Sequence, residues 1–376
     1  MNSKERVLTT IDHKEPDKIP IDSWMVYELQ ESIRSYLNID ISRDRFLMEK
    51  ALGNDMLYRY IGISEGFNSI YKVERKVGNN LFKDRWGIIW KKVTTGCSSY
   101  CVISEYPLKD IKRYDNYKWP NPLTDEIDAI EMYKELINRD GKEYAIVGAI
   151  SCTMLEASWY LRGLENFLID LYKNKDFAIE LLDKTMRYHL TLAKKLVELG
   201  VDIVWFGDDI ASEQGPLLNP TLYRELIKPR HAFMIQELKK INRDIKIAYH
   251  TDGNIEWVLN DLIEIGVDIL NPLQPDVNDV AMIKKKYGKK LTFWGNVDTR
   301  KIMSEGSCFD VIQEVKNVIR TLAPGGGFIL CSNHRIQNTP RAFENLITFY
   351  WAAHTFRKYP IKLSVIKKQY KADWYL

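Results

Sequence analysis

The chain has 376 residues, of which 45% are hydrophobic, 28% charged and 12% aromatic, so it is a globular protein with ample material for a core. The 54 basic residues nearly balance the 51 acidic ones, and the net charge of +3 gives no support for nucleic-acid binding. The five cysteines are scattered, which is typical of reduced thiols, and no apolar signal core or long uncharged run occurs. We therefore expect a cytoplasmic protein that binds no membrane.

The N-terminal part of the chain mixes short helices with strands. Residues 19–22 predict the first core strand, and residues 55–60 predict a second strand or a helix end. From about residue 68 to 105, β-branched and aromatic residues alternate with turns, so we predict a β-rich insertion beside the main body. Helical patterns occur at residues 3–12, 26–38 and 43–54.

The rest of the chain alternates apolar runs with helical patterns. The runs begin near residues 144, 202, 245, 267, 291 and 327. A helical pattern at about residues 124–139 precedes the first run, and others separate the runs, at about 154–172, 175–199, 219–240, 255–265, 277–287 and 308–322, with a last one at 341–356. This alternation predicts parallel βαβ units. A strand total close to eight favours a closed (β/α)₈ TIM barrel, formed by a single domain over residues 1–376.

Polar side chains follow the predicted strands where each strand ends. His250 ends the run that begins at residue 245, and Asp208 and Asp209 follow the run at 202–207. Because barrel active sites lie at the carboxyl ends of the strands, these side chains are candidates for a common mouth. The same positions on later strands hold Asn271, Gln274, Asn296, Cys331, His334 and Gln337.

Two histidines could carry chemistry at this mouth. Two imidazoles with one carboxylate make a workable zinc site that leaves a position open, and His250 and His334 would supply the imidazoles. A core histidine that caps a helix, or a metal-free pair of histidines acting as acid and base, remains an alternative. Of the adjacent acids Asp208 and Asp209, at most one points inward if the strand continues.

Eight ordered blocks of the chain carry a resemblance to a known family, namely residues 6–20, 84–90, 156–163, 207–215, 250–253, 268–274, 292–298 and 325–337. Together they resemble the uroporphyrinogen decarboxylase superfamily. The resemblance implies a (β/α)₈ barrel with its site at the carboxyl ends of the strands. In true uroporphyrinogen decarboxylases, arginines after the first strand bind the carboxylates of a tetrapyrrole, whereas residues 19–30 here contain no arginine. Cofactor-free decarboxylation is therefore the alternative and not the first interpretation.

The other branch of this superfamily is similar to zinc methyltransferases that exchange methyl groups with a corrinoid protein. Its coenzyme M members bind zinc through a His-x-Cys element and a distant cysteine. Here the first element reads His250-Thr251-Asp252, and the distant position falls near His334, with Cys331 as a rival. The resemblance thus implies imidazole and carboxylate ligands in place of thiolates, which suits a Lewis acid for an oxygen-bound methyl group.

The resemblance implies a methyltransferase of the O-demethylase type, acting on a small methyl donor such as an aromatic methyl ether. We expect Zn²⁺ in the barrel mouth, methylcobalamin carried by a separate corrinoid protein, and a homodimer as the commonest assembly. The zinc ligands would come from His250, His334, Asp252 or Cys331, with Glu156 or Asp208 as the first choice of carboxylate. The candidate catalytic residues are Glu156, Asp208, His250, Asn296 and His334. The candidate donor pocket comprises Trp24, Trp159, Asp209, Asn271, Gln274 and Gln337, the tryptophans having core packing as the alternative.

Overall fold

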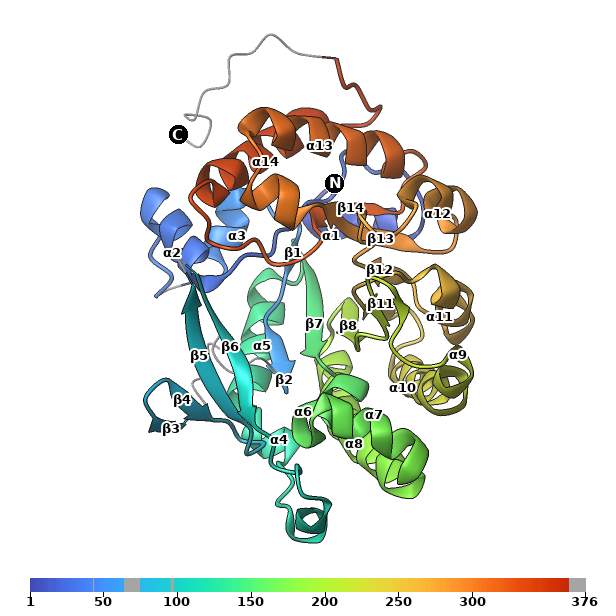
Figure 1. The fold of residues 1–376 in the computed structure, drawn as a ribbon. Helices are drawn as coiled ribbons and strands as arrows, with labels where there is room; N and C mark the ends of the chain where they lie inside the picture. Colours follow the sequence, from blue (N-terminus) through green and yellow to red (C-terminus); the bar gives the residue numbers. More distant parts are fainter. Residues whose placement is uncertain (43, 64–74, 96–97, 365–376) are drawn as a thin grey trace.

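The centre of the computed structural model is a parallel sheet, and the structure describes residues 1–42, 44–63, 75–95 and 98–364 (Figure 1). The sheet has the order β1-β7-β8-β11-β12-β13-β14, and β2 also pairs with β7. Its strands are β1 (Met56–Leu57), β2 (Tyr60–Gly62), β7 (Ala145–Ser151), β8 (Ile203–Gly207), β11 (Lys246–His250), β12 (Ile269–Asn271), β13 (Thr292–Val297) and β14 (Phe328–Ser332).

The segment of residues 19–22 closes this sheet into a ring. Its Pro20 carbonyl accepts from the N–H of Leu330 in β14 at 2.9 Å, and the Ile21 carbonyl accepts from the N–H of Asp55, just before β1, at 2.9 Å. The first predicted strand therefore lies between β14 and β1. The predicted α/β fold of the TIM-barrel type is confirmed.

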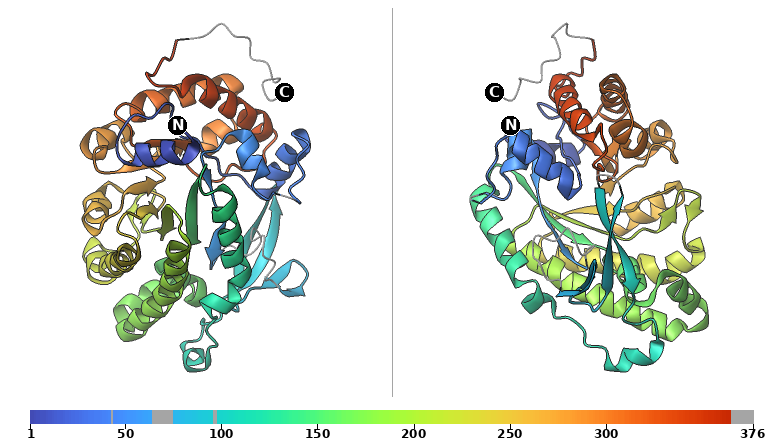
Figure 2. Two further views of the ribbon diagram at one scale, coloured as in Figure 1. Left: turned by 180° about the vertical axis from the view of Figure 1, so that it is seen from behind. Right: turned by 60° about the vertical axis from the view of Figure 1, so that its left-hand side comes forward.

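Helices surround the ring and bury their apolar faces against it (Figure 2). Their positions agree with the predicted ranges to within a few residues, because each carries the 3.6-residue apolar period that a barrel helix needs. The outer helices are α5 (Ile127–Asp140), α8 (Lys175–Leu199), α10 (Lys228–Ile241), α11 (Leu259–Ile265), α12 (Val280–Tyr287), α13 (Cys308–Leu322) and α14 (Ala342–Phe356). The others are α1 (Ser3–Ile11), α2 (Tyr27–Tyr36), α3 (Leu47–Leu52), α4 (Pro122–Asp125), α6 (Leu155–Arg162), α7 (Leu164–Lys173) and α9 (Pro220–Leu222).

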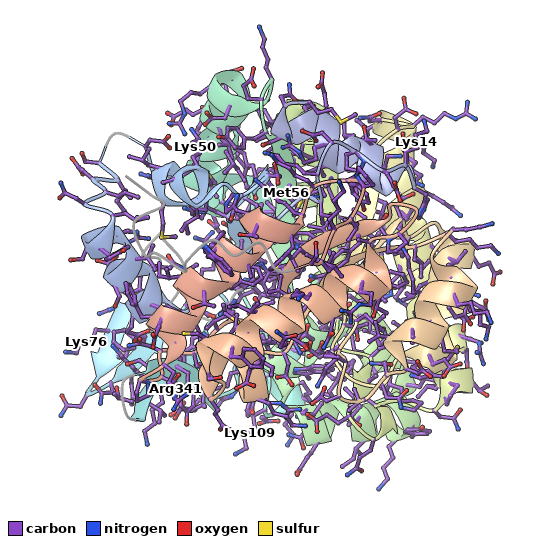
Figure 3. The ribbon with its side chains drawn as sticks, turned by 90° about the horizontal axis from the view of Figure 1, so that it is seen from above. Lys14, Lys50, Met56, Lys76, Lys109 and Arg341 are labelled. Carbon is purple, nitrogen blue, oxygen red and sulfur yellow. The ribbon has the colours of Figure 1, made fainter. Side chains whose placement is uncertain are left out.

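The interior of the ring combines small and very large side chains. Ala149 and Ala248 leave room for Trp205 and Trp294, and all four are buried. Met56, fully buried, is labelled in the interior of the molecule in Figure 3, whereas Lys76 and Lys109 lie at its periphery. Because indole rings fill much of the interior of the ring, the base of the barrel mouth is mainly aromatic.

A separate antiparallel sheet lies beside the barrel (Figures 1 and 2). Trp90 of this sheet packs edge-on against Tyr160 of α6, with ring centroids 5.8 Å apart, and the N–H of Ser99 donates to Glu28 of α2 at 3.1 Å. The sheet thus joins α2 to α6 at the side of the barrel, as a β-rich insertion would. Its strands are β3 (Arg75–Gly78), β4 (Leu81–Lys83), β5 (Ile89–Thr95) and β6 (Ser98–Glu105).

The predicted insertion is only partly covered by the described residues. Its first residues and the turn expected near Gly96 lie outside them. A short ribbon of β9 (Ala211–Ser212) and β10 (Gly215–Pro216) follows β8. Along the described stretches, no helix combines the length and apolarity needed to cross a bilayer.

Candidate metal site at the barrel mouth

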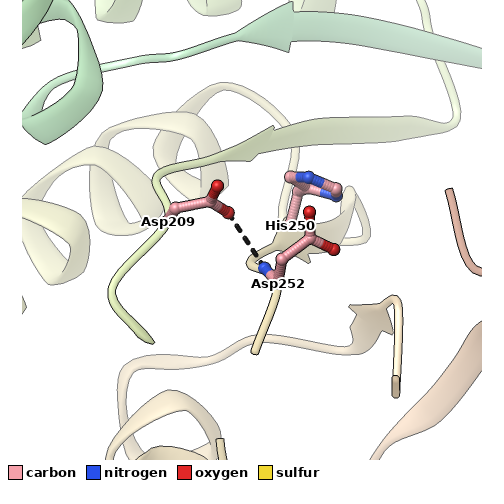
Figure 4. A group of neighbouring side chains, drawn as sticks. All are labelled: Asp209, His250 and Asp252. Carbon is pink, nitrogen blue, oxygen red and sulfur yellow. Dashed lines mark hydrogen bonds between the residues drawn. The ribbon is translucent and has the colours of Figure 1, made fainter. Parts of the chain in front are cut away.

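Asp209, His250 and Asp252 converge at the carboxyl ends of β8 and β11 (Figure 4). One ligand atom from each side chain lies within 4.8 Å of the other two. The strands bring them together because His250 pairs in register with Gly207, two residues before Asp209. A Cβ on Gly207 would lie 2.1 Å from the His250 carbonyl oxygen, so only glycine allows this close approach.

The ring of His250 is held in one tautomer by Asn271, its register partner on β12. Trp205 Nε1 donates to Asn271 Oδ1 at 2.9 Å, and Asn271 Nδ2 donates to the Trp294 carbonyl at 2.8 Å. These two bonds fix which end of the amide is the oxygen and which is the nitrogen. His250 Nδ1 lies 2.9 Å from the same Oδ1 and must donate to it. Nε2 therefore keeps its lone pair for a ligand, the arrangement common among metal-binding histidines.

The two carboxylates of the cluster repel each other. Burial, and then the charge of Asp252, raise the pKa of Asp209 to about 6, although His250 opposes this rise. The backbone N–H of Asp252 donates to Asp209 Oδ1 at 2.9 Å, which holds the two side chains close in spite of the repulsion. A cation at this point would relieve it.

His334 lies next to this cluster, at the edge of the mouth. Its Nε2 lies 3.6 Å from Asp252 Oδ2, and its side chain is 51% exposed. Imidazole nitrogens and carboxylate oxygens are ligands of catalytic zinc, which commonly keeps one open position. The donors present therefore fit Zn²⁺, with His250, Asp209 and Asp252 as the compact group and His334 in reach.

Asp208, the neighbour of Asp209, has a different environment below the mouth. It is fully buried, and its oxygens accept from the backbone N–H groups of Met154 and Glu156 at 3.0 and 2.9 Å and from His231 Nε2 at 2.9 Å. Burial alone would raise the pKa of Asp208, but His231 and the two N–H groups hold it below its ordinary value. These bonds fix the start of α6 on β8 and leave Asp208 outside the cluster.

Cys331 also lies apart from the cluster, inside the ring. It is fully buried, and its Sγ lies 3.9 Å from Asp22 Oδ2. Burial, and then the charge of Asp22, raise the pKa of the thiol well above its ordinary value. Because zinc binds the thiolate and not the thiol, this environment opposes a ligand role.

The remaining predicted residues surround the mouth at different depths. Glu156 is buried and accepts from the N–H of Asp209 at 3.3 Å, and Gln274 Oε1 accepts from the N–H of Gly253 at 3.0 Å, so both support the cluster's loops.

The backbone of Asn296 has a φ of +87°, a conformation that residues other than glycine rarely adopt. Its buried Oδ1 has no hydrogen-bond partner in the described part of the chain. Trp159 stacks edge-on with Tyr160, and Gln337 donates to the Arg335 carbonyl at 3.3 Å.

An aromatic wall separates the cluster from a neighbouring cavity. The rings of Trp24 and Trp205 lie 5.6 and 4.9 Å from that of His250, measured between centroids, and Tyr60 contacts both tryptophans. Beyond Trp24, a cavity of 560 Å³ extends over α2 and α3. No local sequence pattern reveals this cavity, because its walls come from segments far apart in the chain.

The absence of arginine from residues 19–30 led us to expect no counter-charges for a substrate with several carboxylates. The cavity corrects this expectation, because later segments supply cations to it. Four arginines from later segments line it, namely Arg34, Arg45, Arg59 and Arg335.

Comparison with known proteins agrees with this architecture. A Methylcobamide:CoM methyltransferase MtaA of Methanosarcina barkeri is 24% identical over 213 residues, covering 55% of this chain and 59% of that protein. A uroporphyrinogen decarboxylase of Legionella pneumophila (strain Corby) is 25% identical over 237 residues, covering 61% of this chain and 64% of that protein. The match thus spans about three fifths of the length of these relatives.

A solved structure shares the fold over nearly the whole chain. It is a methyltransferase from Methanosarcina mazei, which covers 95% of this chain and 99% of its own with a TM-score of 0.71 at 16% identity. The family model described as uroporphyrinogen decarboxylase matches residues 92–356, well over half of the chain. The chain therefore belongs to the uroporphyrinogen decarboxylase family.

Proposed function

We propose that this protein is a zinc-dependent methyltransferase that moves a methyl group between a small-molecule donor and a separate corrinoid protein. The observation that carries the proposal is the group of Asp209, His250 and Asp252, whose ligand atoms lie within 4.8 Å of one another at the barrel mouth. The methyltransferases among the relatives support the same reaction class. Zinc bound there would act as a Lewis acid that polarises the heteroatom of the donor's methyl bond.

The chain's own residues prepare this reaction in three ways. Asn271 holds His250 Nδ1 as a donor, so the Nε2 lone pair is already available when a ligand binds. Trp24 and Tyr60 offer aromatic edges beside His250 for the body of the donor. If Asp209, His250 and Asp252 hold the metal, His334 remains outside the ligand set, half exposed next to Asp252, and would donate a proton to the departing group.

The second reactant, which exchanges the methyl group with the small molecule, is a corrinoid carried by a partner protein. The mouth is open on the side of His334, whose exposure leaves room for a partner to approach. An aromatic methyl ether as donor and a homodimeric assembly belong to the same proposal.

The second candidate function is a uroporphyrinogen decarboxylase-like reaction. Decarboxylases of comparable identity are among the relatives, and the arginine-lined cavity offers counter-charges for carboxylates. Such a reaction would need no metal, so the two functions differ in their dependence on zinc.

A methyl-transfer assay tests the proposal. The purified chain, with zinc added or removed by chelation, is mixed with a reduced corrinoid protein and an aromatic methyl ether, and loss of the reduced corrinoid absorbance is followed. We expect turnover that requires zinc and is lost in Asp209→Asn. Equal rates with and without zinc, or release of CO₂ from uroporphyrinogen in place of methyl transfer, would contradict it.

A further inference from the structure

Trp24 separates the metal site from the cavity beside it. Its ring centroid lies 5.6 Å from that of His250, with 50° between the ring planes, and its side chain is also part of the cavity wall, to which His250 does not contribute. Trp24 belongs to neither a helix nor a regular strand, because it lies between residues 19–22 and α2. The groups that hold this indole therefore determine how the metal site is bounded on that side.

The backbone around Trp24 is held by the chain at and after β14. The N–H of Asp22 donates to the Leu330 carbonyl at 3.0 Å, the N–H of Ile336 donates to the Trp24 carbonyl at 2.9 Å, and the N–H of Val26 donates to the Ile336 carbonyl at 3.1 Å. These bonds fix the main chain. They leave the rotation of the indole about its own side-chain bonds to other contacts.

The indole is held by a chain of two hydrogen bonds. Trp24 Nε1 donates to the Tyr58 hydroxyl, and this hydroxyl donates to Asp22 Oδ2 at 2.8 Å. Burial, and then the charge of Asp22, raise the pKa of Tyr58 well above its ordinary value, so the phenol keeps its proton. Because an indole N–H can only donate and a phenol has a single proton, the direction of both bonds is fixed. The N–H of Trp24 is therefore engaged by Tyr58.

Asp22 is an acceptor that cannot easily move. It is buried, its Oδ2 also accepts from Trp294 Nε1 at 3.2 Å, and its Oδ1 accepts from Asn54 Nδ2 at 3.1 Å. The amide of Asn54 is oriented in turn, because its Oδ1 accepts from the Tyr350 hydroxyl at 2.6 Å. Three donors thus meet at one carboxylate, which fixes the place of the Tyr58 hydroxyl.

Trp205 contacts His250 as well, and its N–H is engaged in the same way. Its ring lies 4.9 Å from that of His250, and its Nε1 donates to Asn271 Oδ1 at 2.9 Å. Both indoles that contact His250 therefore have their N–H groups bonded to the protein. They present carbon atoms beside the metal ligand, so they suit the apolar body of a ligand whose polar atom the metal binds.

We propose that Tyr58 is a positioning residue of the metal site, which acts through Trp24 on the binding of the methyl donor. Its hydroxyl, held by Asp22, keeps the indole beside His250 before any ligand arrives. The donor then packs against a surface that is already ordered, which lowers the entropic cost of binding. This inference rests on the proposed function for the reaction, but the position of Trp24 can be measured without turnover.

Fluorine NMR of the full chain labelled with 5-fluorotryptophan reports the Trp24 ring directly. Its signal is identified by its absence in Trp24→Phe, and Co²⁺, a paramagnetic substitute for zinc, is added to the metal-free chain. We expect one narrow Trp24 signal in the wild type, and Co²⁺ should shift it. In Tyr58→Phe the indole N–H loses its acceptor, so the Trp24 signal should move and broaden, and its response to Co²⁺ should change.

Tyr359→Phe is the matched control. It also deletes one phenolic hydroxyl, which donates to the Ala323 carbonyl at 2.7 Å, and it should keep the Trp24 signal of the wild type. Thermal melts check that each variant folds. A Trp24 signal that is the same in the wild type and in Tyr58→Phe, both without and with Co²⁺, would overturn the proposal.

A double-mutant cycle tests whether Tyr58 acts through Trp24. With a reduced corrinoid protein and methoxybenzene as donor, Tyr58→Phe should raise KM about fivefold and leave kcat within about twofold, because lost packing weakens the bound donor and the transition state alike. In a Trp24→Phe background the same substitution should leave KM unchanged. An equal rise of KM in both backgrounds would contradict the assignment, because Tyr58 would then act on its own.

These measurements separate the positioning role from the proposed function. A Trp24 signal that depends on Tyr58, in a chain that transfers no methyl group to any corrinoid, would keep the contact between Tyr58 and Trp24 and reject the methyltransferase. Methyl transfer with the same KM in the wild type and in Tyr58→Phe would keep the methyltransferase and reject the positioning role.

Discussion

Two regions of the barrel mouth place reactive side chains at the ends of strands, yet they have different properties. On the β8 and β11 side, Asp209, His250 and Asp252 converge, with one ligand atom of each within 4.8 Å of the other two. On the side where residues 19–22 meet β14, Cys331 and Asp22 are buried against each other with raised pKa values. Position at a strand end is therefore not enough, because burial and hydrogen-bond partners decide which groups can be ligands.

The largest effects should distinguish the two neighbouring aspartates. Asp208→Asn leaves His231 facing an amide in a buried site, and we expect it to lower the free energy of unfolding by about 3 kcal/mol. Asp209→Asn should weaken zinc binding by more than about 100-fold, beyond the range of outer-shell changes, and leave stability nearly unchanged. Urea unfolding of the metal-free chain and zinc titration measure both. The reverse pattern would mean that Asp208 is the ligand.

Asn271 offers the next test. Asn271→Ala removes the acceptor that fixes the His250 ring, so zinc affinity should fall about 10- to 100-fold while the ligands themselves remain. Competition with a chromogenic chelator measures the change. Gln30→Ala, an amide deletion on α2 away from the cluster, serves as control, and equal affinity in both variants would refute the role given to Asn271.

Asp22 should give stability a pH dependence that the metal cluster does not explain. Its folded pKa of about 7 lies above the ordinary value because of burial, so the folded state binds this proton more tightly than the unfolded state. Stability should then fall as pH rises from about 4 to 7, by at most about 4 kcal/mol. Asp22→Asn should flatten that part of the profile of unfolding free energy against pH. An identical profile in the variant would contradict the assignment.

Cys331→Ala should have the smallest effect on metal. Because the thiol is buried away from the cluster, we expect zinc stoichiometry and affinity to stay within about twofold of the wild type. Chelator competition measures this too. A large loss would bring the thiol back into the ligand set.

Much of the fold could be predicted from the sequence. The alternation of buried strands and helices determined the barrel, because a strand buried on both faces and an amphipathic helix have distinct apolar periods. His250 was identified for the same reason, as the residue that ends an apolar run before a glycine turn. The single-domain organisation and the roles of individual site residues stay predictions.

The parts of the site that were not predicted depend on tertiary structure. The sequence could not decide between Asp208 and Asp209, because β8 ends at Gly207 and the alternation of a strand applies to neither acid. The arginine cavity joins residue 335 to residues 34–59, a separation that no local pattern reveals. The seclusion of Cys331 depends on Asp22, which pairs with β14 only in the closed ring.

The central claim is that the barrel mouth is a zinc site built on His250. The most direct measurement is the zinc content per chain, by elemental analysis, of the wild type, His250→Ala and Cys331→Ala after dialysis against zinc. The account predicts about one zinc in the wild type and in Cys331→Ala, and none in His250→Ala. A wild type without zinc, or a His250→Ala protein that retains it, would contradict the claim.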